Sequence, residues 1–298
     1  MQRITVGIPS YNEGMGLVRL LRQLSGQRLD NYSICEVIVS DDSDDNTPTL
    51  VKKHVRNTPY KLILLHHNER RGVAEAWNEI FREALGDIIV LYDADVILEP
   101  DTTINLVRHI GGDVGVAASN TLPLKARTVA GKASETVARW LRRLRLSNPD
   151  AQFTVMGRGL AIRRELAKRI RIPENVIAVD LYLQLSAERM GWRVRYVDEA
   201  HVWFRPVESF RDFASQVIRA YLGHRQLRRF KGKALKWLGL REQARVFLEI
   251  IGEDLKLLPH ILVSYLLTLL LMPMLLPRSG THKWEIATTS KDKESYSR

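Results

Sequence analysis

The sequence predicts an α/β protein with a mostly parallel central sheet that carries helices on both faces. Three observations support this fold class. Apolar runs of strand length alternate with segments of helical spacing through the first third of the chain. These runs are apolar nearly throughout, which is typical of strands buried on both faces. The chain has 298 residues, 45% of them hydrophobic, which is enough for one large core or two modest ones.

Four strands and three helices are expected in the first part of the chain. The strands are residues 3–9, 35–40, 61–67 and 87–93. The helices between them are residues 15–25, 46–56 and 73–85. Strands that alternate with helices in this way form parallel pairs joined by right-handed crossovers. In such sheets the ligand binds beyond the carboxyl ends of the strands.

A second region, roughly residues 113–205, alternates less regularly but contains the same kinds of element. We expect a strand at 115–124, a basic helix at 128–146, a strand and then a helix within 153–166, a helix at 177–191 that begins near Asp180, and a strand at 192–204. No internal repeat and no low-complexity tract precede the polar tail, residues 278–298.

Two aspartates separated by one small residue end the fourth expected strand, in the sequence IIVLYDAD. Residues i and i+2 of an extended chain point to the same side, so Asp93 and Asp95 can both face a ligand beyond the strand end. Their negative charges would repel each other, and a divalent cation would relieve the repulsion. Mn²⁺ or Mg²⁺ suits such a site, because each binds one or two carboxylates together with phosphate oxygens and water. Solvated acids in a turn are the alternative for this motif taken alone.

A second pair of acids, Asp41 and Asp42, follows the expected strand 35–40 and so belongs to the same rim of the sheet. A carboxylate there can accept a hydrogen bond from a base imide or from ribose hydroxyls, whereas it would repel a phosphate. We therefore expect a nucleotide held by its base and sugar, with a metal ion bridging its phosphates. Neither GxGxxG nor GxxxxGKS/T occurs, which argues against dinucleotide enzymes and P-loop NTPases.

Seven short motifs occur in the order and approximate spacing of one known family. They are IPSYNEG, SDDSDDNT, RGVAEAWN, YDAD, GRGLAIRR, VDLYL and QVIRAY. Over about residues 3–225 the chain thus resembles glycosyltransferase family 2, which has the GT-A fold. The resemblance implies transfer of a sugar from a nucleotide-diphosphate sugar, with inversion at the anomeric carbon, by a catalytic domain at residues 1–225.

The resemblance also assigns residues of this sequence to the donor site. The positions are Pro9, Tyr11 and Glu13 in the nucleoside pocket, Asp42 on the base, Arg71 and Asn78 elsewhere in the donor site, and Asp93 with Asp95 as the metal motif. Asp93 thereby belongs to the nucleotide-sugar site as well as to the metal site.

On the acceptor side, the resemblance implies that Asp180 is the catalytic base. Gln216, Arg219 and Tyr221 are similar to the Q-x-x-R-W signature that lies over the diphosphate and the acceptor. This chain departs from the family pattern at three places. Val179 stands where a Glu usually precedes the base, and Ala220 followed by Tyr221 replaces the Trp. The SDDSDDNT loop is one residue shorter than the common form.

His201, within the expected strand 192–204, has two interpretations. It is placed to supply a third metal ligand or to contact the acceptor. A lone histidine in a strand is more often a packed and hydrogen-bonded side chain. The sequence leaves both open.

Positive charge is concentrated near the carboxyl end of the chain. The formal net charge is +11, and residues 225–245 hold eight Lys or Arg and one Glu, a net of +7. The apolar segment 255–277 follows, with Lys256 as its only charged residue. Basic residues beside an apolar segment favour an anionic lipid surface over a nucleic acid as partner. We therefore expect residues 226–277 to form a basic amphipathic helix and a membrane-associated segment.

The orientation of that segment stays open. Its length of about 20 residues is sufficient to span a bilayer. Pro259 and Pro273 shorten the unbroken helix, and positive charge on both sides gives no clear orientation. A spanning helix, a helix or hairpin within one leaflet, and a buried helix of a soluble protein are the three alternatives.

Cys35 is the single cysteine and the N-terminus has no secretory pattern, so we expect a cytoplasmic catalytic domain. Three functions remain. The first is an inverting glycosyltransferase that acts on a hydroxyl of a lipid-linked or glycan acceptor at the cytoplasmic membrane face. The second is a polyprenyl-phosphate sugar synthase, whose phosphate acceptor needs no base. The third is a non-catalytic module that binds nucleotide sugars and membranes.

Overall fold

The computed structural model describes residues 1–54, 58–149, 151, 154–230 and 238–275. The polar tail at 278–298 lies outside the described residues. Eight strands of the described chain form one sheet, in the order β3-β2-β1-β4-β7-β6-β8-β5. They are β1 (Gln2–Ser10), β2 (Tyr32–Asp41), β3 (Lys61–His66), β4 (Ile88–Tyr92), β5 (Ile97–Leu98), β6 (Val114–Pro123), β7 (Gly159–Arg163) and β8 (Arg193–Phe204).

Most of the sheet is parallel, as the sequence predicts. Strands β3, β2, β1 and β4 form parallel pairs, and β6 is parallel to β8. Strand β7 lies between β4 and β6 and is antiparallel to both, while β5 is antiparallel to β8. The reversal of β7 follows from its entry point, because Gly159 at its start pairs with Tyr92 at the end of β4. Arg158 is thereby held next to Asp93, whose backbone N–H donates to the Arg158 carbonyl at 3.3 Å.

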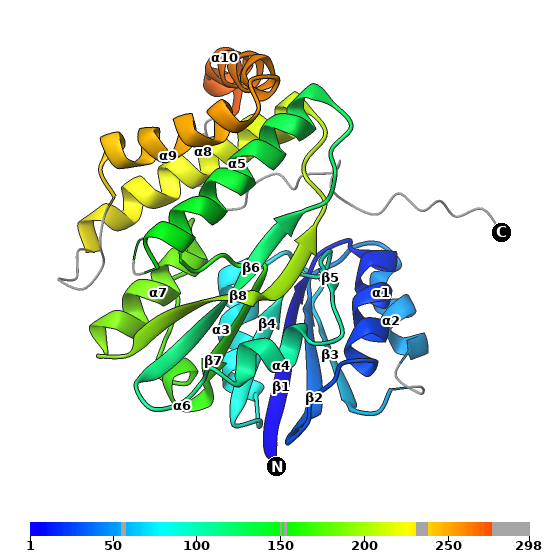
Figure 1. Cartoon of the computed structure of the whole chain (residues 1–298). Coiled ribbons are helices and arrows are strands. Elements are labelled where there is room, and N and C mark those ends of the chain that lie inside the picture. The colour runs from blue at the N-terminus through cyan, green and yellow to red at the C-terminus, as the bar shows by residue number, and fades with distance from the viewer. Residues whose placement is uncertain (55–57, 150, 152–153, 231–237, 276–298) are drawn as a thin grey trace.

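Helices cover both faces of this sheet (Figure 1). Helices α1 (Gly14–Ser25), α2 (Thr47–His54) and α4 (Thr102–Val107) pack on one face, and α3 (Val73–Glu83), α6 (Arg164–Ala167) and α7 (Val179–Arg189) on the other. Alternate residues of β4 enter the two cores, with Val90 in the first and Leu91 in the second. Burial on both faces explains why this strand is apolar throughout. The sequence does not reveal α4 or β5, because elements of six and two residues are too short to show a period.

Four further helices form a layer beyond the sheet (Figure 1). They are α5 (Val129–Ser147), α8 (Phe210–Leu227), α9 (Leu240–Glu253) and α10 (Leu257–Leu275). Helix α5 contacts the other three, and α10 also contacts α8. A small core of Ala130, Ala133, Phe213 and Ile261 joins α5, α8 and α10. This layer is separate from the two cores of the sheet and forms one side of the cleft described below.

The helical layer lies across the expected domain boundary at residue 225. Helix α8 begins at Phe210 and continues through that position to Leu227. The basic segment 225–245 is divided among the end of α8, the 3₁₀ turn Arg228–Phe230 and the start of α9, and residues 231–237 lie outside the described residues. Helix α10 covers most of the expected apolar segment, and Pro259 in its first turn does not interrupt it.

Candidate active site

One large cleft, of about 1420 Å³, opens at the carboxyl ends of β1, β2 and β4. Pro9 and Ser10 end β1, Asp42 follows β2, and Asp93 follows β4. Helices α7 and α8 face these strand ends across the cleft and contribute, among others, Asp180. A cleft therefore lies at the carboxyl edge of the parallel strands, where the sequence predicts a ligand site.

Asp42 is almost fully buried in the cleft wall, and both of its oxygens accept hydrogen bonds. The Arg71 Nε donates to one oxygen at 3.1 Å, and the backbone N–H groups of Arg71 and Gly72 donate to the other at 2.6 and 3.0 Å. Gly72 has a φ of 94°, in the left-handed region that glycine tolerates. The turn before α3 therefore directs two backbone donors at one carboxylate.

Arg71 is fixed between Asp42 and a second carboxylate, that of Glu79 on α3. Its Nη2 donates to Glu79 Oε2 at 2.9 Å and to the Ser40 hydroxyl at 3.2 Å. Burial alone would lower the pKa of Arg71, but the hydrogen bonds to Glu79 and Asp42 raise it. Burial would likewise raise the pKa of Glu79, but hydrogen bonds from Arg71 and Ser40 lower it. Sequence analysis missed Glu79. The one indication of its role in the sequence is that an acidic residue lies on the apolar face of the expected helix.

Asp93 and Asp95 line the cleft in the loop after β4, with Ala94 buried between them. Among the described residues, neither carboxylate accepts a side-chain hydrogen bond or forms an ion pair. Burial raises the pKa of Asp93 to about 7, with a further contribution from the charge of Asp95, while the charges of Arg158 and Arg219 oppose the rise.

These two carboxylates fit a divalent cation. They are hard oxygen donors that lie close enough to interact and have no cationic side chain paired with either, which suits Mn²⁺ or Mg²⁺. The described part of the chain contains no group of three or more His, Cys, Asp or Glu arranged to hold a metal ion. A cation bound here would therefore need further ligands from phosphate oxygens or water.

Asp180 lies in the first turn of α7 and lines the same cleft. Its Oδ1 accepts a hydrogen bond from the Leu181 N–H at 2.9 Å. Its charge reaches two basic side chains of α8, Arg219 and His224. Burial lowers the pKa of Arg219, and the positive charge of nearby Arg158 lowers it further. Burial also lowers the pKa of His224. The negative charge of Asp180 opposes both shifts. Asp180 and Arg219 therefore share one electrostatic environment with Asp93.

Helix α8 approaches the start of α7 unusually closely, at Gly223. A β-carbon added to Gly223 would lie 2.8 Å from the Ala178 β-carbon and 3.1 Å from its backbone nitrogen. Two hydrogen bonds of Gln226 hold the same junction, because its Oε1 accepts from Ile177 N–H at 3.0 Å and its Nε2 donates to Asn175 O at 2.8 Å. Gly223 and Gln226 therefore fix the distance between Asp180 and the cationic side chains of α8.

The structure brings most of the predicted site residues to this cleft. Those that line it are Pro9, Tyr11, Glu13, Asp42, Arg71, Asp93, Asp95, Asp180, Gln216, Arg219 and Tyr221. The Arg70 guanidinium lies over the Tyr11 ring, with its Cζ 4.8 Å from the ring centroid. A shared cleft does not by itself assign a role to each residue, so their separate roles remain predictions.

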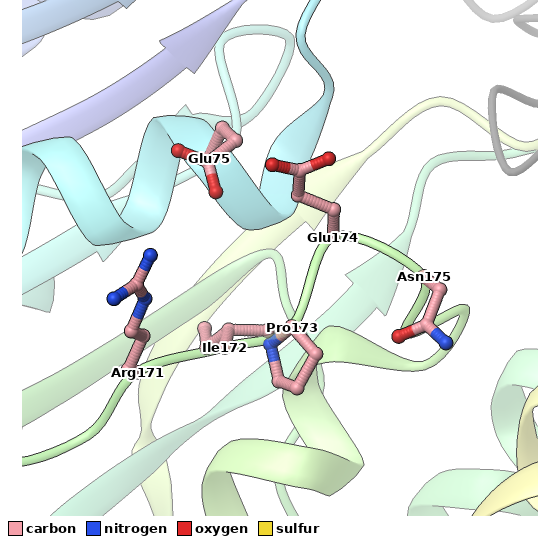
Figure 2. A pocket seen from close by; sticks show the side chains of 6 residues that line it. All are labelled: Glu75, Arg171, Ile172, Pro173, Glu174 and Asn175. Carbon is pink, nitrogen blue, oxygen red and sulfur yellow. The ribbon is translucent and has the colours of Figure 1, made fainter.

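Asn78 is not among the residues that line the cleft. Its Nδ2 donates to Ile172 O at 2.8 Å and its Oδ1 accepts from Ile172 N–H at 2.9 Å, so it joins α3 to the loop before α7. That loop forms a shallow pocket of about 350 Å³ beside α3, with Glu75 and Glu174 on its rim (Figure 2). The geometry gives Asn78 a structural link to the loop that precedes Asp180.

His201 is not brought to Asp93 and Asp95 either. Its Nδ1 lies 3.0 Å from Glu99 Oε2, and the Trp203 indole donates to the other oxygen of Glu99 at 2.8 Å. Hydrogen bonds from Trp203 and His201 lower the pKa of Glu99, although burial alone would raise it. Of the two interpretations of His201, the packed and hydrogen-bonded side chain matches this geometry.

Sequence analysis missed several cationic residues of the cleft. Arg158 lies over the Phe204 ring, 3.8 Å from its centroid, and its charge reaches Asp93 and Arg219. It stands between two glycines in the motif GRGLAIRR, and that position is the signal available in the sequence. His224, Arg225 and Arg228 also line the cleft, beyond the QVIRAY motif.

Comparison with known proteins agrees with this geometry. The family model for glycosyl transferase family 2 matches residues 5–171. A probable glycosyltransferase of Bacillus subtilis, YdaM, is 23% identical over 225 residues, which are 71% of this chain and 52% of that protein. The dolichol-phosphate mannosyltransferase of Pyrococcus furiosus is 32% identical over 120 residues, 39% of this chain and 33% of that protein. The matches thus span about half or less of these relatives.

Solved structures show the same fold. A mannosyltransferase from Pyrobaculum calidifontis, in complex with GDP-Man and Mn²⁺, has a TM-score of 0.62 and 24% identity, and the match covers 92% of this chain and 79% of that one. TarS of S. aureus, in complex with UDP-GlcNAc, has a TM-score of 0.52 and 20% identity over 86% of this chain and 81% of that one. The expected GT-A fold is confirmed. Since the family model also covers more than half of the residues, this chain belongs to glycosyl transferase family 2.

Proposed function

We propose that this glycosyltransferase moves a sugar from a nucleoside-diphosphate sugar to a hydroxyl of a lipid-linked or glycan acceptor, with inversion at the anomeric carbon. The observation that carries the proposal is the arrangement of Asp180 and Arg219 opposite Asp93 and Asp95 in one cleft. This cleft offers a base, a cationic site for a leaving diphosphate and a pair of metal-binding acids.

The strand ends provide the nucleoside subsite. Pro9, Tyr11 and Glu13 form one wall and the Asp42–Arg71 pair forms another. The Ser10 hydroxyl and the Trp77 indole nitrogen also belong to cleft residues, are buried, and have no hydrogen-bond partner among the described residues. Unpaired buried donors are costly, and a bound ligand would satisfy them. These groups therefore fit the polar edge of a nucleotide sugar.

Asp180 acts as the general base. Its carboxylate accepts the proton of the acceptor hydroxyl as that oxygen attacks the anomeric carbon from the side opposite the departing diphosphate. Arg219 and Arg158 line the cleft and stabilise the negative charge that grows on the nucleoside diphosphate. Attack from the opposite side inverts the anomeric carbon.

A divalent ion held by Asp93 and Asp95 would neutralise charge on the donor diphosphate when bound. In the metal-free protein the same two acids place negative charge close to where the diphosphate must bind. We therefore propose Mn²⁺ or Mg²⁺ as the cofactor, on the chemistry of these ligands.

A polyprenyl-phosphate sugar synthase is the second candidate, favoured by the cationic side chains of Arg225 and Arg228 in the same cleft as Asp180. An anionic phosphate acceptor carries no proton that must be removed before attack. The two candidates therefore differ in their need for Asp180.

We also propose that the enzyme works at the cytoplasmic face of a membrane, with residues 226–277 as its membrane-associating part. In the described part of the chain, α10 is the one helix long and apolar enough to cross a membrane, and only 17% of its most apolar window is buried. Ile261, Ser264 and Thr268 are buried against the helical layer, while Leu257 and Leu275 at the two ends are half-buried on the same stripe. Because α10 contacts helices that carry charged residues, a spanning position would bring those charges into the bilayer. A position of α10 within one leaflet is therefore favoured over a spanning one.

The test compares Asp180→Asn with wild type and with Asp113→Asn, whose acid is exposed outside the cleft. Calorimetry measures binding of GDP-mannose and UDP-GlcNAc with Mn²⁺, and a second assay follows radiolabelled sugar into a native membrane fraction. We expect Asp180→Asn to keep donor binding and to lose at least ~100-fold in transfer, the lower end of the usual range for general base catalysis. Full transfer by Asp180→Asn would reject the hydroxyl acceptor in favour of a phosphate one. Failure of every donor to bind with Mn²⁺ would reject the proposed function altogether.

A further inference from the structure

The cleft has two chemically different ends. The strand ends form a polar and charged end, while helices α5, α8, α9 and α10 form an apolar one. The apolar wall, as we call it here, consists of Val137, Leu141, Phe213, Val217, Leu240 and Tyr265. Both ends belong to one continuous cleft of about 1420 Å³, which is larger than a nucleotide sugar requires.

The apolar wall continues the sealed core of the same helices, because Phe213 belongs to that core and Val137 and Val217 pack against it. Ala130 and Ala133 of α5 are buried against α8 and α10. Val137 and Leu141 continue the same stripe of α5 at helical spacing, yet they are only half-buried and line the cleft. Between the buried Ala133 and the buried Leu144, α5 therefore turns half-buried apolar side chains toward the cleft. Large exposed apolar surfaces are uncommon unless they bind something.

The apolar wall adjoins the helix that we place at the membrane. Tyr265 of α10 packs edge-on against Phe213 of α8, with ring centroids 5.6 Å apart, and both line the cleft. Leu262 and Leu269, three residues before and four residues after Tyr265, share its face of α10, Leu266 lies beside them, and all three are at least 60% exposed. A hydrocarbon chain in a bilayer beside these leucines would therefore have to move only along one side of α10 to reach the apolar wall, less than one helix diameter of about 10 Å.

The charges of the cleft suit a polar headgroup. Arg225 and Arg228 of α8 and the turn after it line the cleft together with Asp180. An amphiphile with its chain on the apolar wall would present its headgroup to these residues. A free glycan would leave the wall exposed to water, at a cost of ~25 cal/mol for each Å² of apolar surface.

We propose that the acceptor is a membrane lipid whose hydrocarbon chain lies on the apolar wall and whose headgroup hydroxyl reaches Asp180. This inference rests on the proposed function, and it selects the lipid-linked acceptor over the free glycan. The lipid enters from the leaflet that holds α10. Chain recognition by the wall and deprotonation by Asp180 then act on the two ends of one molecule.

The experiment uses a defined probe, a hexadecyl glucoside with a diazirine in its chain, in phosphatidylcholine vesicles that contain phosphatidylglycerol. The full chain is bound to the vesicles and irradiated, and labelled peptides are mapped by mass spectrometry. We expect label in α5 at residues 137–141 and in α8 at residues 213–217. An excess of hexadecyl glucoside should remove this label, whereas methyl glucoside should not.

Two matched variants separate the wall from the membrane surface. Ala138→Trp adds bulk to a half-buried position that lines the cleft, and Leu266→Trp adds the same bulk to the exposed side of α10. We expect Ala138→Trp to reduce labelling of the wall about tenfold, the equivalent of roughly two methylene groups excluded from contact. Leu266→Trp should leave labelling of the wall unchanged. Circular dichroism and calorimetry with a nucleotide sugar and Mn²⁺ verify that both variants fold.

Label confined to α10, or label in α5 that Ala138→Trp does not reduce, would overturn the inference, because the chain would then lie in the bilayer alone. Cross-links between two copies of the protein through the wall would also overturn it, in favour of a dimer interface. Donor binding distinguishes this failure from that of the proposed function. If a donor binds with Mn²⁺ but the wall is not labelled, only the lipid site is wrong. If the wall is labelled but no donor binds, the wall binds hydrocarbon chains, but the bound lipid is not an acceptor and the proposed function is wrong.

Discussion

Replacing Gly223 by alanine tests whether the separation of α7 and α8 controls the reaction. The added methyl group would lie 2.8 Å from the Ala178 β-carbon, where ordinary contacts between carbon atoms are about 3.5–4.0 Å. The neighbour is a backbone-attached atom that has no rotamer with which to move away. We therefore expect α8 to shift by roughly 1 Å relative to the start of α7. Arg219, one helical turn from Gly223, would move with it and away from Asp180.

Two opposing energies set the effect of Gly223→Ala on stability. Overpacking a buried contact costs about 1–3 kcal/mol, while alanine in place of glycine stabilises a helix interior by about 1 kcal/mol. The net loss in free energy of unfolding should therefore be small, between about 0 and 2 kcal/mol. The loss in rate should be much larger, because a displacement of about 1 Å in a catalytic arrangement can cost ~100-fold.

Urea unfolding and transfer of radiolabelled sugar into a native membrane fraction measure the two effects separately. Gly252→Ala in α9 is the matched control, since a β-carbon there meets no atom within 4 Å. It should gain slightly in stability and keep full activity. The double variant Gly223→Ala with Ala178→Gly removes the clashing β-carbon and should recover part of the rate. Full activity of Gly223→Ala, with stability raised as in the control, would refute the idea that this contact positions Arg219.

Three further predictions concern other parts of the molecule. Glu36→Ala removes the acceptor of two hydrogen bonds, from the Thr5 hydroxyl and from the Leu85 N–H. Each donor left unpaired should cost about 1–3 kcal/mol of unfolding free energy, which urea unfolding of the variant and wild type would measure. Although burial would raise it, hydrogen bonds from His109 and Arg108 lower the pKa of Glu199 to about 2, so its stabilising effect is present above about pH 4.5 and is lost as the pH falls toward 2. Thermal unfolding should therefore distinguish Glu199→Gln from wild type at pH 7 but not at pH 2, and an equal difference at both would contradict this. EDTA should abolish nucleotide-sugar binding in calorimetry and Mn²⁺ should restore it, and undiminished binding in EDTA would contradict the metal site.

The parallel half of the sheet could be predicted because its strands are long, apolar and separated by well-patterned helices. Asp42, Asp93 and Asp95 could be placed together because the carboxyl ends of parallel strands share one edge. The reversal of β7 could not be predicted, because a short apolar run carries no information on strand direction. The link between Asn78 and Ile172 was also beyond prediction, since a side-chain amide that bonds a distant backbone group leaves no periodic pattern.

The position of the predicted base along the chain explains why the acceptor is the hardest part of the function to infer. The family model ends at residue 171 and covers the strand ends with Asp42, Asp93 and Asp95, which we propose as the donor side of the cleft. Asp180, Arg219 and the α8 and α10 contributions to the apolar wall lie beyond it, in helices whose positions depend on contacts such as Gly223 with Ala178. Resemblance to the family therefore bears mainly on the donor, and the acceptor has to be argued from the packing of α5, α7, α8 and α10. A change in that packing would alter the acceptor while leaving donor binding intact, which is why the experiments above measure the two separately.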